Sequence, residues 1–266
     1  MTDRYAVIGN PVVHSKSPWI HAEFARQTGQ DMEYGRIEVP VEGFEAAVAA
    51  FRAAGGRGLN VTLPFKERAY RLASDLSERA RAAAAVNTLM FSVDGTSGDN
   101  TDGVGLVRDL RQNLGFALQG RRVLLAGAGG AAQGVVQPLI AAGVARLVIA
   151  NRTAERARSL AGRFAGLRGC GFGELADERF ELVINATSAG LSGHSPELPA
   201  GILDAGGVAY DMVYGRDTPF LAQARALGAR ACDGLGMLVE QAAESFFIWR
   251  GVRPQTAPVL QVLRAA

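Results

Sequence analysis

Four short polar clusters in the N-terminal half carry most of the side chains that could do chemistry. They contain Ser15 and Ser17; Asn60, Thr62 and Lys66; Asn87 and Thr88; and Asn100, Thr101 and Asp102. Hydroxyl and amide groups can donate and accept hydrogen bonds, which suits a polyhydroxylated small molecule. A lysine and an aspartate in one site form an acid–base pair for the proton that accompanies hydride transfer. Taken singly, Ser15, Asn87 and Asp102 are also ordinary turn or cap residues, so the prediction depends on their convergence.

A glycine-rich segment, Gly127-Ala128-Gly129-Gly130-Ala131-Ala132, has the pattern of a dinucleotide-binding loop. It follows an apolar run that predicts a buried strand, and the residues after it can continue as a helix. Gly127 then permits a tight turn, Gly129 lets the backbone approach a pyrophosphate, and Ala132 lets the helix pack on the strand. The helix N-terminus offers N–H groups to the phosphates. We therefore predict an enzyme that transfers hydride with a dinucleotide, although 33 glycines also produce chance matches.

The end of the next predicted strand favours NADP as the cofactor. Leu147–Ala150 is followed by Asn151-Arg152-Thr153 and then by Arg156. NAD sites usually place an acidic residue here to bind the ribose 2′-hydroxyl, and a carboxylate would repel a 2′-phosphate. Arg152 can instead hold a phosphate with two hydrogen bonds. The alternative is a cluster of solvated surface arginines.

Short apolar runs alternate with helical patterns along most of the chain, which predicts parallel strand pairing and an α/β fold. The predicted strands are Tyr5–Ile8, Gly58–Thr62, Val86–Val93, Arg122–Ala126, Ala145–Ala150, Phe180–Asn185 and Val208–Val213. Helical spacing is found in Phe44–Phe51, Leu106–Leu114, Ala131–Ile140 and Met237–Trp249. We expect two α/β domains with a cleft between them. Residues 1–101, completed by the C-terminal helices 237–266, form an N-terminal substrate domain, and residues 102–236 form a Rossmann-like NADP-binding domain.

The totals exclude several other classes of protein. The 266 residues are 48% apolar, and 28 Lys and Arg against 26 Asp and Glu leave a net charge of +2. That balance argues against nucleic acid or a membrane surface as the main partner. Two isolated cysteines, Cys170 and Cys232, and the absence of a targeting segment indicate a cytoplasmic protein. Three histidines without ligand spacing predict no metal site.

Together, the motifs resemble the NADP-dependent shikimate dehydrogenase family over nearly the whole chain. The matching segments are Gly9-Asn10-Pro11 with His14-Ser15 and Ser17-Pro18, Asn60–Lys66, Ala85–Thr88, Asn100–Gly103, Gly127–Ala132, Asn151–Thr153, Asn185–Gly190, and Gly236–Leu238 with Gln241. The resemblance implies reversible NADPH-dependent reduction of 3-dehydroshikimate to shikimate (EC 1.1.1.25), a step of aromatic amino-acid biosynthesis. It also implies a small-molecule substrate and no macromolecular ligand.

The resemblance also implies roles for individual residues. Lys66 and Asp102 correspond to the catalytic pair. The implied substrate ligands are Ser15, Ser17, Thr62, Lys66, Asn87, Asp102, Tyr214 and Gln241. The implied cofactor contacts are Glu78, Gly127, Ala128, Gly129, Gly130, Ala131, Asn151, Arg152, Thr153, Arg156, Thr187, Met212 and Gly234.

Several alternatives remain open at this stage. An NAD-preferring quinate/shikimate dehydrogenase has the same fold, and a non-catalytic NADP-sensing module would keep only the cofactor loop. Both Lys66 and Asp102 are present, which counts against the module, and Arg152 counts against NAD. The sequence leaves open which of the two catalytic residues carries the proton, and whether the protein is a homodimer.

Overall fold

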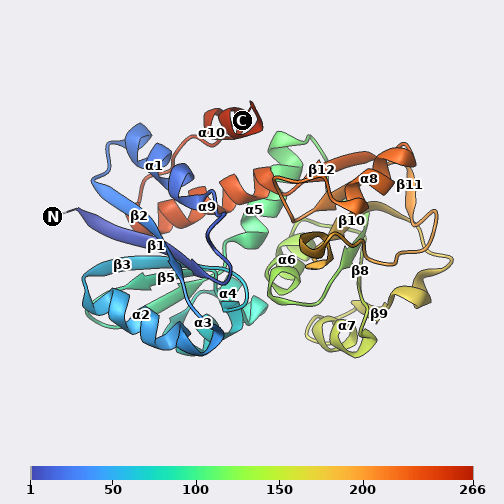
Figure 1. Cartoon of the computed structure of the whole chain (residues 1–266). Coiled ribbons are helices and arrows are strands. Elements are labelled where there is room, and N and C mark those ends of the chain that lie inside the picture. Colours follow the sequence, from blue (N-terminus) through green and yellow to red (C-terminus); the bar gives the residue numbers. More distant parts are fainter. Residues whose placement is uncertain (1, 266) are drawn as a thin grey trace. The chain divides into compact units, whose positions relative to one another are not determined.

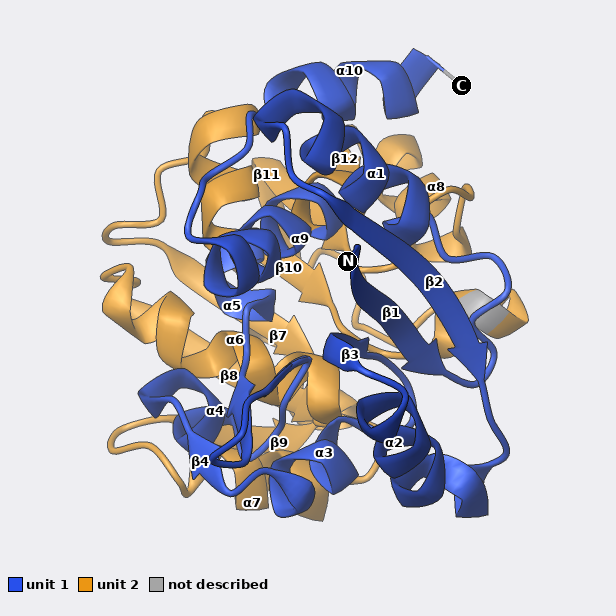
Figure 2. Cartoon of the chain, turned by 90° about the vertical axis from the view of Figure 1, so that its left-hand side faces the viewer, with its two compact units in different colours: residues 1–106, 238–266 blue, residues 107–237 orange. Residues whose placement is uncertain are grey.

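The computed structural model describes residues 2–265 of the chain, apart from the side chain of Leu191. The chain divides into two compact units, shown in blue and orange in Figure 2. Unit 1 comprises Met1–Leu106 and Leu238–Ala266, and unit 2 comprises Val107–Met237. Each unit contains one six-stranded sheet with helices around it, so the predicted two-part α/β fold is confirmed (Figure 1).

Unit 1 has a mixed sheet with the strand order β2-β1-β3-β5-β6-β4. Its strands are β1 (Asp3–Gly9), β2 (Met32–Glu38), β3 (Gly56–Val61), β4 (Asp75–Leu76), β5 (Thr88–Phe91) and β6 (Thr96–Asp99). The prediction of parallel pairing is confirmed for β1 with β3, which pair over Arg4–Ile8. It is wrong for β5, which runs antiparallel to both β3 and β6.

A tight turn explains the reversed strand. The segment Val86–Val93 does not continue as one strand, because Ser92 N donates to Gly95 O at 3.0 Å and Gly95 takes a φ of 153°. Asp-Gly is a common hairpin turn, and it returns the chain directly into β6. Since β5 runs against β3 and β6, Asn87 before β5 lies at the same sheet edge as the residues that follow β3 and β6.

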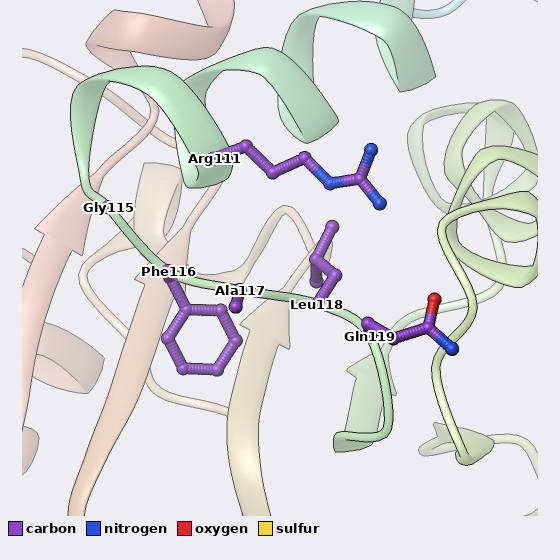
Figure 3. Close-up of a pocket in the computed structure, with 6 residues that line it drawn as sticks. All are labelled: Arg111, Gly115, Phe116, Ala117, Leu118 and Gln119. Atoms are coloured by element: carbon purple, nitrogen blue, oxygen red, sulfur yellow. The ribbon is translucent and has the colours of Figure 1, made fainter.

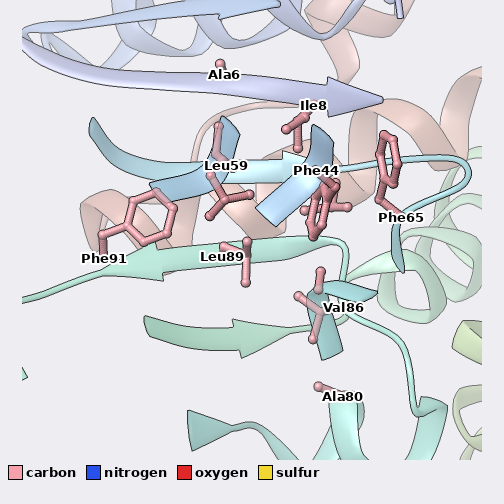
Figure 4. Close-up of a cluster of buried hydrophobic side chains, with 12 residues drawn as sticks. Ala6, Ile8, Phe44, Leu59, Phe65, Ala80, Val86, Leu89 and Phe91 are labelled. Carbon is pink, nitrogen blue, oxygen red and sulfur yellow. The ribbon is translucent and has the colours of Figure 1, made fainter. Parts of the chain in front are cut away.

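The helices of unit 1 surround this sheet and supply the other half of its core. They are α1 (Ser17–Thr28), η1 (Val41–Gly43), α2 (Phe44–Ala53), α3 (Lys66–Leu72), α4 (Glu78–Ala83), α10 (Ala257–Ala265), and the parts of α5 (Asp102–Arg108) and α9 (Leu235–Arg250) that belong to this unit. Figure 4 shows the core, in which Phe44 and Phe65 stack with ring centroids 4.8 Å apart. Burying such rings removes apolar surface from water and fixes the start of α3.

Unit 2 has an all-parallel sheet with the order β12-β11-β10-β7-β8-β9. Its strands are β7 (Arg122–Ala126), β8 (Arg146–Asn151), β9 (Arg168–Gly171), β10 (Phe180–Asn185), β11 (Leu203–Asp211) and β12 (Arg230–Asp233). Its other elements are η2 (Asp109–Asn113), α6 (Gly130–Ala141), α7 (Ala154–Ala161), η3 (Phe172–Leu175), η4 (Ala189–Ser192) and α8 (Pro219–Ala226). Numbered along the chain from β7, the spatial order is 3-2-1-4-5-6, which is the Rossmann order with its switch point between β7 and β10.

A fully buried carboxylate lies between two elements of unit 2. Tyr210, on β11, donates its hydroxyl to Asp109 Oδ2 at 2.6 Å, and Asn113 donates to Asp109 Oδ1 at 3.0 Å. A Cβ added to Gly236 would lie 1.9 Å from Asp109 Oδ1, so only glycine fits against this carboxylate.

Across the described residues, no helix is long and apolar enough to span a bilayer.

Candidate active site

The two predicted catalytic residues meet at one edge of the unit 1 sheet. Lys66 Nζ donates to Asp102 Oδ2, and Asn87 Nδ2 donates to Asp102 Oδ1 at 2.9 Å. The Lys66 and Asp102 side chains are only 14% and 6% exposed. Both carboxylate oxygens therefore have a donor, which satisfies a charge that is otherwise expensive to bury.

Local structure places these side chains. Lys66 is the first residue of α3, after a turn in which Phe65 N donates to Thr62 O at 3.0 Å, and the buried Phe65 ring anchors that turn. Asp102 is the first residue of α5, and Asn100 Oδ1 accepts from its backbone N–H at 3.1 Å. This hydrogen bond holds the start of α5, so the backbone from which the Asp102 carboxylate extends is fixed in position.

Gln241 reaches the same cluster from α9. Its Oε1 accepts from Asn87 Nδ2 at 3.3 Å and from Thr101 Oγ1 at 3.4 Å. Its Nε2 donates to Leu238 O at 2.8 Å, one turn earlier on the same helix. The structure thus brings Gln241 within hydrogen-bonding distance of Asn87, 154 positions away in sequence.

A second layer of polar residues supports Asn87, and sequence reasoning missed two of its members. Asn60 Nδ2 donates to Asn87 O at 3.1 Å and to Ser245 Oγ at 3.0 Å, and Tyr34 donates to Asn60 Oδ1 at 2.7 Å. Ser245 and Tyr34 were not predicted as site residues. Ser245 carried a signal, because it lies four positions after Gln241 and so on the same helix face.

The serine pair joins this network at its other end. Ser15 Oγ donates to Ser17 Oγ at 3.1 Å, and Arg36 holds the Ser15 carbonyl oxygen with a 2.6 Å hydrogen bond from Nη2. Burial raises the pKa of Tyr34 well above its ordinary value of 10.0, and the Ser17 hydroxyl faces the Tyr34 hydroxyl and opposes the shift. Thr62 follows β3 at the same edge, half-buried, and makes no side-chain hydrogen bond with a described residue.

The glycine loop of unit 2 has the geometry that a dinucleotide requires. Gly127 follows β7 with a φ of 122°, and a Cβ there would lie 2.9 Å from the backbone of Ala186. Gly129 is extended and precedes α6, whose N-terminus therefore opens toward the loop. Ala132 is fully buried, as a residue packed between helix and strand must be. The loop lies at the switch point between β7 and β10, where such sheets bind ligands.

The other predicted cofactor residues of unit 2 follow the carboxyl ends of neighbouring strands. Asn151 ends β8, Arg152, Thr153 and Arg156 come after it, Thr187 follows β10, Met212 follows β11, and Gly234 follows β12. The side chains of Arg152 and Arg156 are exposed, and neither is paired with an acidic residue in the described part of the chain. Unpaired guanidinium groups at this place suit the 2′-phosphate of NADP.

Buried hydrogen bonds hold these strand ends in place. Thr187 Oγ1 donates to Asn185 Oδ1 at 2.7 Å, and Asn185 Nδ2 donates to Asp211 Oδ2 at 3.1 Å. Burial raises the pKa of Asp211, while a 2.6 Å hydrogen bond from Thr218 opposes that shift. A Cβ on Gly234 would lie 2.4 Å from Met212 O, so the last two strands approach closely.

Two predicted residues belong to a different unit from the rest of their set. Glu78 is exposed at the first turn of α4, in unit 1, whereas the rest of the cofactor set is in unit 2. Tyr214 is half-buried after β11, in unit 2, whereas the rest of the substrate set is in unit 1. A cavity of about 290 Å³ in unit 2, shown in Figure 3, is lined by Arg111 and residues 115–119 and contains none of the predicted residues.

The histidines take no part in the cluster. His14 and His194 are exposed, and His21 is fully buried against Tyr34, with ring centroids 4.2 Å apart and nearly parallel planes. Burial lowers the pKa of His21 to about 3. Asn60 lies near the ring and opposes that shift, but neither ring nitrogen makes a hydrogen bond of good geometry to any described residue. Within residues 2–265, no three His, Cys, Asp or Glu side chains gather as metal ligands do.

The Rossmann sheet with its glycine loop, in one chain with an α/β unit that carries a lysine–aspartate pair, defines a dinucleotide-dependent oxidoreductase. Three family models match the chain: the shikimate dehydrogenase substrate binding domain over residues 7–89, shikimate / quinate 5-dehydrogenase over 109–192, and the shikimate 5'-dehydrogenase C-terminal domain over 234–264. The chain belongs to the shikimate dehydrogenase family.

Individual relatives match over their whole length. The chain is 59% identical to the shikimate dehydrogenase (NADP(+)) of Methylobacillus flagellatus, covering 99% of this chain and 100% of the relative. An Ael1 enzyme from Pseudomonas putida has a TM-score of 0.91 at 49% identity, covering 98% of both chains. The shikimate 5-dehydrogenase of Thermus thermophilus, solved in complex with NADP(H) and shikimate, has a TM-score of 0.89 at 35% identity, covering 99% of both.

Proposed function

We propose that the chain catalyses the reversible NADPH-dependent reduction of 3-dehydroshikimate to shikimate, with Lys66 and Asp102 as the acid–base pair. The shikimate dehydrogenase family, its NADP-dependent relatives and the free Arg152 support this reaction, which serves aromatic amino-acid biosynthesis. The observation that carries the assignment is the buried Lys66–Asp102 ion pair, whose second carboxylate oxygen accepts from Asn87.

Lys66 performs the proton transfer in this proposal. NADPH, when bound, supplies the hydride that reduces the ketone carbon. The Lys66 ammonium group gives a proton to the oxygen of that carbon as negative charge develops on it. In the oxidative direction the neutral Lys66 amine accepts the proton from the hydroxyl. Asp102 holds Lys66 in place and accepts a hydrogen bond from a neighbouring substrate hydroxyl.

The surrounding polar groups orient the substrate. Asn87 and Gln241 face the remaining hydroxyls, and the hydroxyls of Ser15 and Ser17 bind the carboxylate. Thr62 and Tyr214 complete this set. The hydroxyl and amide groups of these substrate ligands would recognise a polyhydroxylated ring, because each such group can both donate and accept hydrogen bonds.

The cofactor-binding residues fit NADP by shape and charge. The backbone of Gly127 to Ala131 would hold the pyrophosphate, because Gly127 adopts a φ of 122° and α6 begins at Gly130. Asn151, Thr153 and the two free arginines Arg152 and Arg156 would hold the 2′-phosphorylated ribose. Thr187, Met212 and Gly234 would contact the nicotinamide half, and Glu78 would contribute from unit 1.

We assign the substrate to residues 1–101 with 237–266, and NADP to residues 102–236. Two buried cysteines without a disulfide support a cytoplasmic location. A homodimer is the assembly we propose, and light scattering after gel filtration tests it. A monomeric mass would reject the dimer without affecting the assigned reaction.

The decisive experiment is shikimate-dependent reduction of NADP⁺, followed by absorbance of the reduced nicotinamide. We expect turnover with shikimate and NADP⁺ and much slower turnover with quinate or NAD⁺. Faster reaction with quinate and NAD⁺ would favour the quinate/shikimate alternative. Binding of NADP⁺ without turnover would identify a cofactor-sensing module instead.

A further inference from the structure

A half-buried arginine joins two segments that carry proposed substrate ligands. Arg79 lies on α4, and its Nε and Nη2 donate to the two oxygens of Asp99 at 3.0 and 2.7 Å. Its Nη1 donates to Glu244 Oε1 at 3.0 Å. The side chains of Asp99 and Glu244 are only 16% and 9% exposed, so the guanidinium group compensates two largely buried charges. Ser77 Oγ also donates to Asp99 Oδ1 at 2.6 Å, and Arg253 also pairs with Glu244 at 2.8 Å.

The contact between Arg79 and Asp99 holds the segment that leads to Asp102. Asp99 ends β6, its backbone oxygen accepts from Asn87 N at 3.0 Å, and its Oδ1 accepts from Asn100 N at 2.6 Å. Asn100 in turn accepts from the backbone N–H of Asp102 at 3.1 Å. The position of Asp99 therefore determines the positions of both Asn87 and Asp102 through these hydrogen bonds.

The contact between Arg79 and Glu244 holds α9. Glu244 lies three residues after Gln241, so both are on neighbouring turns of one helix. The Asn87 amide donates to Asp102 at 2.9 Å and to Gln241 at 3.3 Å, so it requires the start of α5, directly after β6, and α9 at a fixed separation. A lysine has no fork and cannot make the same three contacts, whereas arginine binds both carboxylates at once.

We propose that Arg79 is a positioning residue for substrate binding, because it fastens the Asp102 segment to the Gln241 helix and so holds Asn87 between them. This proposal rests on the proposed function of the same site. Among the described residues, the side-chain hydrogen bonds of Arg79 go to Asp99 and Glu244, both in unit 1. Its loss should therefore weaken shikimate binding while leaving the NADP-binding residues of unit 2 unaffected.

The test uses the full chain and compares KM values in shikimate-dependent NADP⁺ reduction. Arg79→Met and Glu244→Met keep the apolar stems and remove one side of the contact each. We expect each to raise KM for shikimate about tenfold or more, since losing one well-placed hydrogen bond to the substrate weakens binding by about that factor. KM for NADP⁺ should change less than twofold. The double variant should raise KM for shikimate no further than Arg79→Met does, because both single variants break the same Arg79–Glu244 link.

Arg253→Met is the matched control. Arg253 binds the other oxygen of Glu244 at 2.8 Å but has no contact with Asp99, so its loss should leave KM for shikimate within twofold of wild type. Arg79→Lys should resemble Arg79→Met in KM. If Arg79→Met fails to fold, Glu244→Met still decides.

Three results would overturn the proposal: an unchanged KM for shikimate in Glu244→Met, an equal rise of both KM values, or additive effects in the double variant. Failure of the proposed function is distinguishable, because wild type itself would then show no shikimate-dependent turnover.

Discussion

Asn87 donates its side-chain amide to Asp102 Oδ1 at 2.9 Å, on the oxygen opposite the one that accepts from Lys66. The neutral amide fixes the plane of the carboxylate without adding a second charge. Asp102 can then hold the lysine and still present its face to a substrate hydroxyl. The proposed chemistry therefore depends on a lysine that is held by a carboxylate, and the Asn87 amide fixes the position of that carboxylate.

Replacing Lys66 tests the proton transfer. Lys66→Ala should lower kcat by about 10² or more, with a smaller effect on KM for shikimate, because general acid–base catalysis contributes about that factor. Lys66→Arg keeps the positive charge but cannot release its proton near neutral pH, so its kcat should stay low. Steady-state kinetics at saturating NADP⁺ measures both. Near-normal turnover in either variant would remove Lys66 from its proposed role.

Replacing Arg152 tests the cofactor assignment. Arg152→Ala should raise KM for NADPH about 10- to 100-fold and leave KM for NADH nearly unchanged, because only NADPH carries the 2′-phosphate. Arg158→Ala is the control, since this exposed arginine on α7 is paired with Glu174 at 2.9 Å. Equal effects of Arg152→Ala on both cofactors would contradict a phosphate contact.

The buried His21 should make stability depend on pH. Burial lowers its pKa from 6.5 to about 3, so the folded protein keeps the ring neutral while the unfolded chain binds a proton below pH 6.5. Stability is therefore unaffected above pH 6.5 and is lost as the pH falls from 6.5 toward 3. At about two pH units below the unfolded value the loss is roughly 3 kcal/mol, at ~1.4 kcal/mol per unit.

Urea unfolding at several pH values measures this loss. His21→Leu should flatten the dependence between pH 6.5 and 4.5, whereas His14→Leu, at an exposed position, should leave it unchanged. An equally steep dependence in His21→Leu would show that other groups are responsible.

Removing the Tyr210 hydroxyl should destabilise unit 2. Tyr210→Phe removes the 2.6 Å hydrogen bond that Tyr210 donates to the buried Asp109 side chain, and a buried polar group with one donor fewer costs about 1–3 kcal/mol. Tyr70→Phe, at a half-buried position of α3, serves as the control. Denaturant midpoints measure both variants, and unchanged stability of Tyr210→Phe would mean that Asp109 finds another donor.

Local patterns were sufficient for the parts of the fold that are regular. The glycine loop, its flanking strand and helix, and Arg152 are contiguous, so their geometry follows from short-range rules. β2, β9 and β12 escaped prediction because they are short or half-exposed and contain charged residues, with glycine as well in β2 and β9, so their pairing with neighbours makes them strands. The direction of β5 depended on Asp94-Gly95, a turn signal directly after the predicted strand Val86–Val93.

Within the candidate site, local sequence patterns single out the residues that follow strand ends. Lys66, Asp102 and Asn87 lie at strand ends, where ligands bind in α/β sheets. The supporting roles of Tyr34 and Ser245 arise from contacts across 26 and 185 positions with Asn60, and no local pattern encodes such contacts. Arg79 is likewise an ordinary helix residue until Asp99 and Glu244 are brought to it.

Because β5 is reversed, the exposed turn of the β5–β6 hairpin lies at the opposite end of the sheet from the candidate site. Asn87 and Asp102 lie at one end of the β5–β6 hairpin, and the turn Ser92–Gly95 lies at the other, about 13 Å away along four residues of strand. Val93, at that turn, is 98% exposed. A fluorophore, affinity tag or immobilisation linker attached there would leave the catalytic edge untouched, so the hairpin gives this enzyme a natural point of attachment.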